Sequence, residues 1–202
     1  QVRLAISAYS EGDKVQAQRV LEIEPAINKE QLDTDQLCSE VIARRQPAAK
    51  DLRLLLGVIR TISDLERVAD EAAKIAKLVI REDQRDILPR IHSIFQAAEM
   101  AILMLRKALD AFAREDGDAA REVMASDSKL DEQYIGSMRQ LITYMMEDPR
   151  TIGDAVDDLW VAKAIERIGD HAENIAEVAI YVGEGEDVRY SGNLPVQNSD
   201  SE

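Results

Sequence analysis

Two pairs of acidic residues with the same spacing are the strongest chemical signal in the sequence. Glu66 and Asp70 are four residues apart, and so are Glu166 and Asp170. Four residues turn an α-helix by about 400°, so the two carboxylates of a pair would lie on one helical face, one turn apart. Carboxylate oxygens are ligands for hard cations such as Mg²⁺, Mn²⁺ and Ca²⁺, and carboxylate-rich sites also hold iron.

The two pairs belong to an internal repeat. Segment 165–177, IERIGDHAENIAE, matches segment 65–77, LERVADEAAKIAK, at an offset of 100 residues. Such a repeat indicates two copies of one structural unit. Around each pair, apolar residues alternate at spacings of three and four, which is typical of a seam between packed helices. They are Ile62, Leu65, Ala69, Ala72, Ala76 and Val79 in the first copy, and Ala162, Ile165, Gly169, Ala172, Ala176 and Ala179 in the second. The carboxylates are therefore expected beside the buried seam, not in it.

The preceding helix of each unit offers a second pair of oxygen ligands with the same spacing. Glu24 and Asn28 hold the place in the first unit that Asp127 and Asp131 hold in the second. If these helices pack side by side, each unit gathers three to five oxygens around one cation. The predicted ligands are Glu24, Asn28, Glu66 and Asp70 in the first unit, and Asp127, Asp131, Glu166, Asp170 and Asn174 in the second. The ion would be Mg, Mn, Zn or Fe, and the sequence does not distinguish these.

An alternative interpretation is that these side chains are solvated acidic flanks of amphipathic helices, in a protein whose formal net charge is −14. Like charges four residues apart destabilise a helix by about 0.2–0.5 kcal/mol, and a bound cation would offset this repulsion. Lys74 would partly compensate Asp70 in the first unit, whereas Asn174 holds the equivalent place in the second. Both interpretations stay open at the level of sequence.

Other residues near the pairs are expected to have structural roles. Arg67 and Arg167 share one position of the repeat and are expected to form salt bridges. His171 is expected at the surface or in an interface, and Trp160 is expected to pack against its neighbours. Cys38 is the only cysteine, so no intramolecular disulfide is possible and a place in the core is expected.

Composition favours long, closely packed helices. The chain is 46% hydrophobic but only 4% aromatic, so its core must consist of aliphatic side chains. The charge of −14 argues against nucleic acid or an anionic membrane as a direct partner, since both need basic faces. No local basic cluster requires phosphate itself to bind. No apolar run approaches the length of a membrane span and the first residues do not resemble a signal peptide, so a cytoplasmic protein is expected.

The predicted fold class is all-α, with no β pattern. Residues 1–10 are predicted to end a helix, and Asp13 is predicted to cap the next one. Pro25 should kink that helix near Glu24 because its ring removes a backbone hydrogen bond. Helices are predicted at 13–46, 48–82, 85–114, 118–147 and 150–182, with Pro89 in the first turn or two of the third. They form a three-helix unit over 1–82 whose opening helix is incomplete, a second over 83–190, and a flexible tail over 191–202.

Several motifs together resemble the PhoU family of phosphate-signalling regulators. They are RRQPAAKDLR at 44–53, MMEDPR at 145–150, the two E-R-hydrophobic-x-D blocks, and GEDVRY at 185–190. The resemblance extends from about residue 2 to residue 190. It implies two tandem three-helix repeats with metal bound at the E-x-x-x-D faces in some members. The proline at position 25 and the short opening helix depart from the family pattern.

The resemblance also implies a function. Family members repress the phosphate regulon when phosphate is plentiful, and they couple the phosphate ABC transporter to a membrane sensor histidine kinase. The expectation is thus a non-enzymatic negative regulator of phosphate uptake. It would form a homodimer, contact the kinase and the transporter's ATPase subunit, and meet the membrane only through these partners.

Two other functions compete with this expectation. A di-metal enzyme of the helical-bundle kind uses E-x-x-H pairs, but the nearest match, Glu166 to Gly169, has glycine in place of histidine. The sequence also offers no P-loop and no Ser-His-Asp set. The remaining alternative is a helical protein-interaction scaffold without a metal or phosphate-signalling role.

Overall fold

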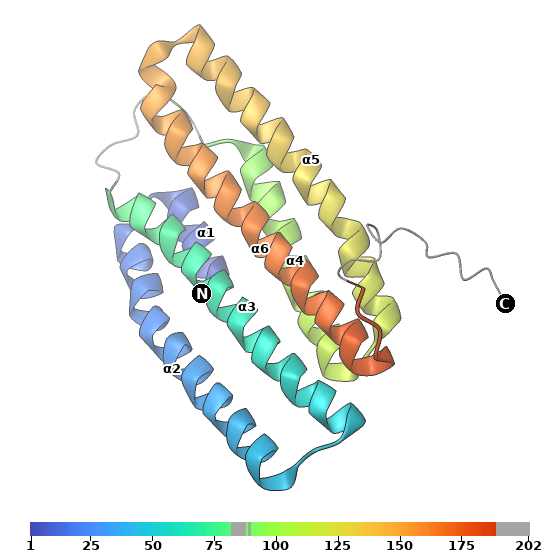
Figure 1. The fold of residues 1–202 in the computed structure, drawn as a ribbon. Coiled ribbons are helices and arrows are strands. Elements are labelled where there is room, and N and C mark those ends of the chain that lie inside the picture. Colours follow the sequence, from blue (N-terminus) through green and yellow to red (C-terminus); the bar gives the residue numbers. More distant parts are fainter. Residues whose placement is uncertain (82–87, 89, 189–202) are drawn as a thin grey trace, which may run out of the picture.

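The computed structural model describes residues 1–81, 88 and 90–188, and these contain long helices and no strand (Figure 1). The all-α prediction is confirmed. The helices are α1 (Val2–Glu11), α2 (Lys14–Arg45), α3 (Ala49–Arg81), α4 (His92–Arg114), α5 (Gly117–Glu147) and α6 (Ile152–Glu184), with a short 3₁₀ turn, η1 (Pro149–Thr151), before α6.

The turns that precede α2 and α5 have the same conformation and the same type of helix cap. A residue in the left-handed conformation, Gly12 in one turn and Glu115 in the other, reverses the chain. The aspartate that follows caps the next helix: Asp13 accepts hydrogen bonds from the backbone N–H groups of Val15 and Gln16. Asp116 does the same for Ala119. The predicted N-cap at Asp13 is therefore confirmed, and the caps satisfy backbone donors that have no partner within the helix.

Two predicted helix boundaries need correction. The helix predicted from 85 begins only at His92, because Leu88 and Ile91 are not helical. A proline disfavours helical geometry in the residue before it, and Pro89 follows Leu88. Leu88 instead donates its backbone N–H to Asp154 of α6. The last helix starts at Ile152 and continues to Glu184, beyond the predicted end at 182.

The structure tests only some of the remaining predictions about the helices and their connections. Helix α2 continues through Pro25, and the kink expected near Glu24 stays a prediction. Cys38 is buried, as expected. The predicted place of Pro89 in a first helical turn, the unit boundary at 82/83 and the predicted tail 191–202 lie outside the described residues.

Helices α3 and α6, which carry the repeated acidic pairs, lie side by side in the middle of the molecule (Figure 1). Helices α1 and α2 pack on α3, and α4 and α5 pack on α6. Contacts at both ends show that α3 and α6 are antiparallel. Near the start of α3, the Arg60 guanidinium lies 5.2 Å from the centre of the Tyr181 ring. Near its end, Arg81 forms an ion pair with Asp157 at 2.5 Å.

The core is aliphatic, and the predicted seam is buried along most of its length. Ala69, Ala72, Ala76 and Val79 of α3 are almost inaccessible, and so are the corresponding residues of α6. Small residues let the helices approach closely. At Gly169, a Cβ atom would collide with the Leu130 side chain of α5. None of the described helices combines the length and the hydropathy needed to cross a membrane.

Candidate metal sites on two acidic faces

Three aspartates from two helices meet beside the seam between α5 and α6. Asp127 and Asp131 come from α5, and Asp170 comes from α6. One oxygen of each carboxylate lies within 4.8 Å of the other two, and all three side chains are partly buried. Oxygens bound to one Ca²⁺ or Mg²⁺ ion sit about 2.0–2.6 Å from it, so up to about 5 Å from each other. A single cation could therefore contact all three carboxylates.

The electrostatics of this group favour a positive ligand. Burial, with repulsion from Glu166 and Asp127, raises the pKa of Asp170 from 3.8 to about 6. Burial also raises the pKa of Asp127, with a further contribution from Asp131. In addition, Oδ1 of Asp127 is buried and has no hydrogen-bond partner. A cation would supply both the missing charge and a partner for this oxygen.

Glu173 belongs to the same acidic face and was missed by the sequence reasoning. Burial raises the pKa of Glu173 from 4.5 to about 7, and repulsion from Asp127, Glu177 and Asp170 adds to the effect. Glu173 stands three residues after Asp170, so helical spacing could have found it. The repeat concealed it, because the equivalent residue of the first copy is Ala73.

Two other predicted ligands of the second unit have different surroundings. Glu166 forms an ion pair with Lys163 at 2.5 Å, although its charge still acts on Asp127 and Asp170. Asn174 does not join the aspartates through the hydrogen bond that it makes: its Nδ2 donates to Oδ1 of Asp64 on α3, at 3.3 Å. In an α-helix, a side chain points about 40° further around the axis than the side chain four residues before it. Asn174 is therefore turned away from the direction of Asp170 and toward α3.

The first unit gathers a similar but looser set. Burial raises the pKa of Glu66, and the charges of Asp70 and, more weakly, Glu24 of α2 add to the shift. Oδ1 of Asn28 is buried without a hydrogen-bond partner. The four predicted residues thus include three interacting carboxylates and an amide oxygen that needs a partner. Within the described ranges, only the second unit brings three His, Cys, Asp or Glu side chains within ligand distance of one another.

Lys74 has a different partner from the one expected. Its Nζ lies 2.7 Å from Oε1 of Glu71, whereas compensation of Asp70 was predicted. The same Glu71 oxygen accepts a hydrogen bond from Arg167 of α6 at 3.2 Å, which confirms the salt bridge predicted for that arginine. Glu71 is buried between the two helices and draws both cations toward the interface.

The two acidic faces border one surface of the molecule. A cavity of about 400 Å³ between α3 and α6 is lined by both Asp70 and Asp170, together with Arg67, Arg167 and His171. The internal repeat and the antiparallel packing place equivalent residues of the two units on opposite walls. The carboxylates of both units can therefore act on a ligand bound at this surface.

Comparisons with known proteins agree with this architecture. A model described as the PhoU domain matches residues 1–79 and 94–179. The chain belongs to the PhoU family. Among curated PhoU proteins, the phosphate-specific transport system accessory protein PhoU homolog of Pseudomonas putida is 43% identical over 193 residues, covering 95% of this chain and 75% of the relative. The accessory protein PhoU of Escherichia coli is 41% identical over 188 residues, covering 93% and 78%.

Solved PhoU structures have the same fold. The crystal structure of PhoU from Pseudomonas aeruginosa matches with a TM-score of 0.89 and 41% identity, covering 92% of this chain and 90% of that one. The family resemblance inferred from the motifs is thereby confirmed.

Proposed function

We propose that this PhoU-family protein is a non-enzymatic negative regulator of phosphate uptake and of the phosphate regulon. It acts as an adaptor between the phosphate ABC transporter, through the ATPase subunit, and a membrane sensor histidine kinase. The observation that carries the proposal is the 43% identity, over 95% of this chain, to a protein named as an accessory of phosphate-specific transport. An accessory protein of a transport system acts by binding its components, so a helical molecule with two chemically distinctive faces suits the role.

The proposal includes cations, Mg, Mn, Zn or Fe, at the two acidic faces. Asp127, Asp131 and Asp170 support it by their mutual distances, and the unpartnered buried oxygens of Asp127 and Asn28 support it by their need for a ligand. A bound cation would supply positive charge that lets these carboxylates stay ionised side by side. The predicted ligands come from α5 and α6 in one unit and from α2 and α3 in the other. By sharing a cation they would keep the two helices of each unit in the arrangement that a partner recognises.

The decisive experiment is genetic. Cells that lack the protein should express alkaline phosphatase, a reporter of the phosphate regulon, even when phosphate is plentiful. The wild-type gene should restore repression. The variant Asp131→Asn should restore it incompletely, whereas the matched control Glu132→Gln, an exposed neighbour on the same helix, should behave as wild type. Normal repression in the deletion strain would exclude the regulatory role.

A binding experiment separates the adaptor from a helical scaffold that uses neither metal nor phosphate signalling. The purified protein is mixed with the transporter's ATPase subunit or with the kinase freed of its membrane segments, with and without a chelator. An adaptor with functional metal sites should bind both partners and should bind less well in chelator. Binding of neither partner would favour the alternative scaffold. Light scattering on the same samples tests the proposed homodimer.

A further inference from the structure

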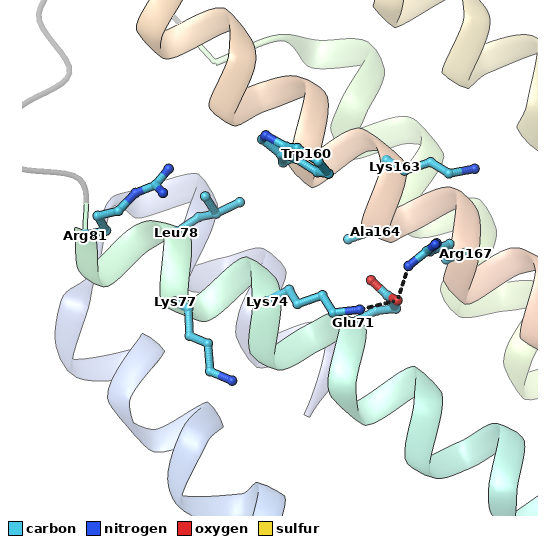
Figure 2. Close-up of a pocket in the computed structure, with 9 residues that line it drawn as sticks. All are labelled: Glu71, Lys74, Lys77, Leu78, Arg81, Trp160, Lys163, Ala164 and Arg167. Atoms are coloured by element: carbon cyan, nitrogen blue, oxygen red, sulfur yellow. Dashed lines mark hydrogen bonds and ion pairs between the residues drawn. The ribbon is translucent and has the colours of Figure 1, made fainter.

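A second cavity, of about 550 Å³, lies between α3 and α6 and differs in charge from the rest of the protein (Figure 2). Its cationic lining residues are Lys74, Lys77, Arg81, Lys163 and Arg167. Glu71 is the one acidic residue among those that line it. Lys74 and Arg167 pair with Glu71, Lys163 pairs with Glu166 and Arg81 pairs with Asp157. These five cations outnumber the three carboxylates, so the cavity keeps a positive balance in a chain whose net charge is −14. No basic cluster was expected from the sequence, because the cations come from two segments about 90 residues apart.

The two cavities between α3 and α6 form one groove. They share Glu71, Lys74 and Arg167 as lining residues. On α6 the lining residues run from Trp160 to Asn174 with steps of three and one, and pairs three or four apart lie on one helical face. Fourteen residues of helix correspond to about 21 Å. The groove is thus elongated. Lys77, Arg81 and Lys163 line only the part with Trp160, whereas Asp70 and Asp170 line the other part, together with Arg67.

The basic end of the groove has an apolar surface. Figure 2 shows Trp160 of α6 facing Leu78 of α3 across the space between the helices, with Ala164 beside them. Trp160 is 62% exposed, so the expectation that it packs in the protein is wrong. Val156 and Ile152, one and two turns earlier on α6, are also exposed. Together they make an apolar stripe that leads into the groove.

We infer that this groove binds an acidic amphipathic helix of a partner protein. The apolar face of the helix would lie on Trp160, Leu78 and Ala164, and its acidic side chains would meet the cationic rim. The inference rests on the adaptor function proposed above and specifies the chemistry of the partner segment.

Three features favour a helix over a small anion. The groove is about four helical turns long, its walls are two helices, and its lining combines tryptophan with aliphatic carbon. Tryptophan and arginine are also the residues that most often dominate the binding energy of protein interfaces. A phosphate-sized anion would use the cations but would leave Trp160 and the stripe of Ile152 and Val156 uncovered.

The fluorescence of Trp160 provides a direct test, because it is the only tryptophan of the chain. The probe is a synthetic peptide of about sixteen residues with leucine at helical spacings on one face and glutamate elsewhere. One control peptide has lysine in place of glutamate, and a second has the same composition in an order without a leucine face. The acidic amphipathic peptide should shift the emission of Trp160 saturably, and the two controls should not.

Variants locate the binding site. The double change Lys77→Glu and Arg81→Glu reverses charge on the α3 side of the groove and leaves the reporter Trp160 in place. It should weaken binding of the acidic peptide by about tenfold or more, with a smaller loss in high salt. The matched control Lys107→Glu reverses the charge of a lysine that lines a different cavity, on α4, and should bind the peptide as wild type does. Circular dichroism should show equal helix content in all three proteins.

Equal binding of the lysine peptide, or unchanged affinity for the acidic peptide in the double variant, would overturn the inference. So would a third result, in which inorganic phosphate, ATP or anionic phosphatidylglycerol vesicles shift the emission of Trp160 and the acidic peptide does not. The reporter strain keeps this outcome separate from failure of the proposed function. If the wild-type gene restores repression but the acidic peptide does not bind, only the groove's assigned occupant is wrong. If the deletion strain represses normally, the regulatory function is wrong whatever the peptide does.

Discussion

Nδ1 of His171 lies 2.9 Å from Oδ1 of Asp64, across the interface between the two repeats. Asn174 donates a hydrogen bond to the same oxygen, so one buried carboxylate of α3 binds two side chains of α6. The internal repeat does not reproduce this link, since Ala164 and Glu71 occupy the equivalent positions. Glu71 instead pairs with Arg167. The two halves of the molecule are thus joined by contacts that are not symmetric, and His171 lies in an interface, in agreement with its expected role.

Replacement of Asp64 by alanine should destabilise the protein. His171 and Asn174 would lose their shared acceptor at a site that water reaches poorly, and such a loss costs about 1–3 kcal/mol. Urea denaturation followed by circular dichroism measures the change in the free energy of unfolding. Asp33→Ala, at an exposed position of α2, is the control and should change it by less than about 0.5 kcal/mol. Equal effects of the two variants would contradict a joining role for Asp64.

The metal-free protein should be more stable at pH 5 than at pH 8. The pKa of Asp170 is raised to about 6 and that of Glu173 to about 7, chiefly by burial. A carboxyl whose pKa is raised by folding favours the folded state while it is protonated, and this contribution is lost as the pH rises through the folded pKa. This stabilising contribution should be lost between about pH 4 and pH 7, and the loss should be complete above pH 7.

Thermal unfolding in a chelator at several pH values measures this dependence. The variant that combines Asp170→Asn with Glu173→Gln carries no ionisable group at these positions, so its Tm should vary less between pH 5 and pH 8. An identical pH profile in the variant would show that the two carboxyls do not titrate as described.

Addition of a divalent cation should stabilise the chelator-treated protein. Binding to the folded state alone adds about 2.7 kcal/mol when the free cation concentration is one hundred times its Kd. Mg²⁺, Mn²⁺, Zn²⁺ and Fe²⁺ are compared at pH 7.5 by the rise in Tm, with elemental analysis of the purified protein. Asp127→Asn with Asp170→Asn should remove the metal of the second unit, whereas Glu132→Gln should retain it. Unchanged metal content in the double variant would refute this site.

Gly169→Ala should loosen the contact between α5 and α6. The new Cβ would collide with Leu130, and the shift needed to relieve it typically costs about 1–3 kcal/mol. Oδ1 of Asp127 is only 3.8 Å from the position of the new Cβ, so the affinity of the second unit for a cation should fall as well. Denaturation curves and metal titration measure the two effects.

Gly136→Ala is the matched control for that substitution. A Cβ at Gly136, within α5, meets nothing within 4 Å. Alanine there should stabilise the helix by roughly 0.5–1 kcal/mol, since glycine loses more backbone freedom on folding. If both alanine variants were stabilised, the described packing of Leu130 on Gly169 would be wrong.

The sequence by itself determined the features that depend on local spacing. The repeat predicted equivalent acidic pairs on two helices, the periodicity predicted the helices and their seam, and Asp13 predicted a cap. These succeed because a helix places residues three and four apart on one face whatever surrounds it. The first residue of α4 was predicted less well, because the segment before it is held by a contact with Asp154, distant in the sequence.

The tertiary structure alone decided which residues share a surface. The drift of side chains around α6 turns Asn174 toward Asp64 and leaves Glu173 beside Asp127, although spacing along the chain suggests both as neighbours of Asp170. The antiparallel packing of α3 on α6 gathers cations from two distant segments into one groove. It also leaves Trp160 exposed at the edge of that groove. Such properties depend on how two helices are placed relative to each other, and the order of residues within one helix does not contain that information.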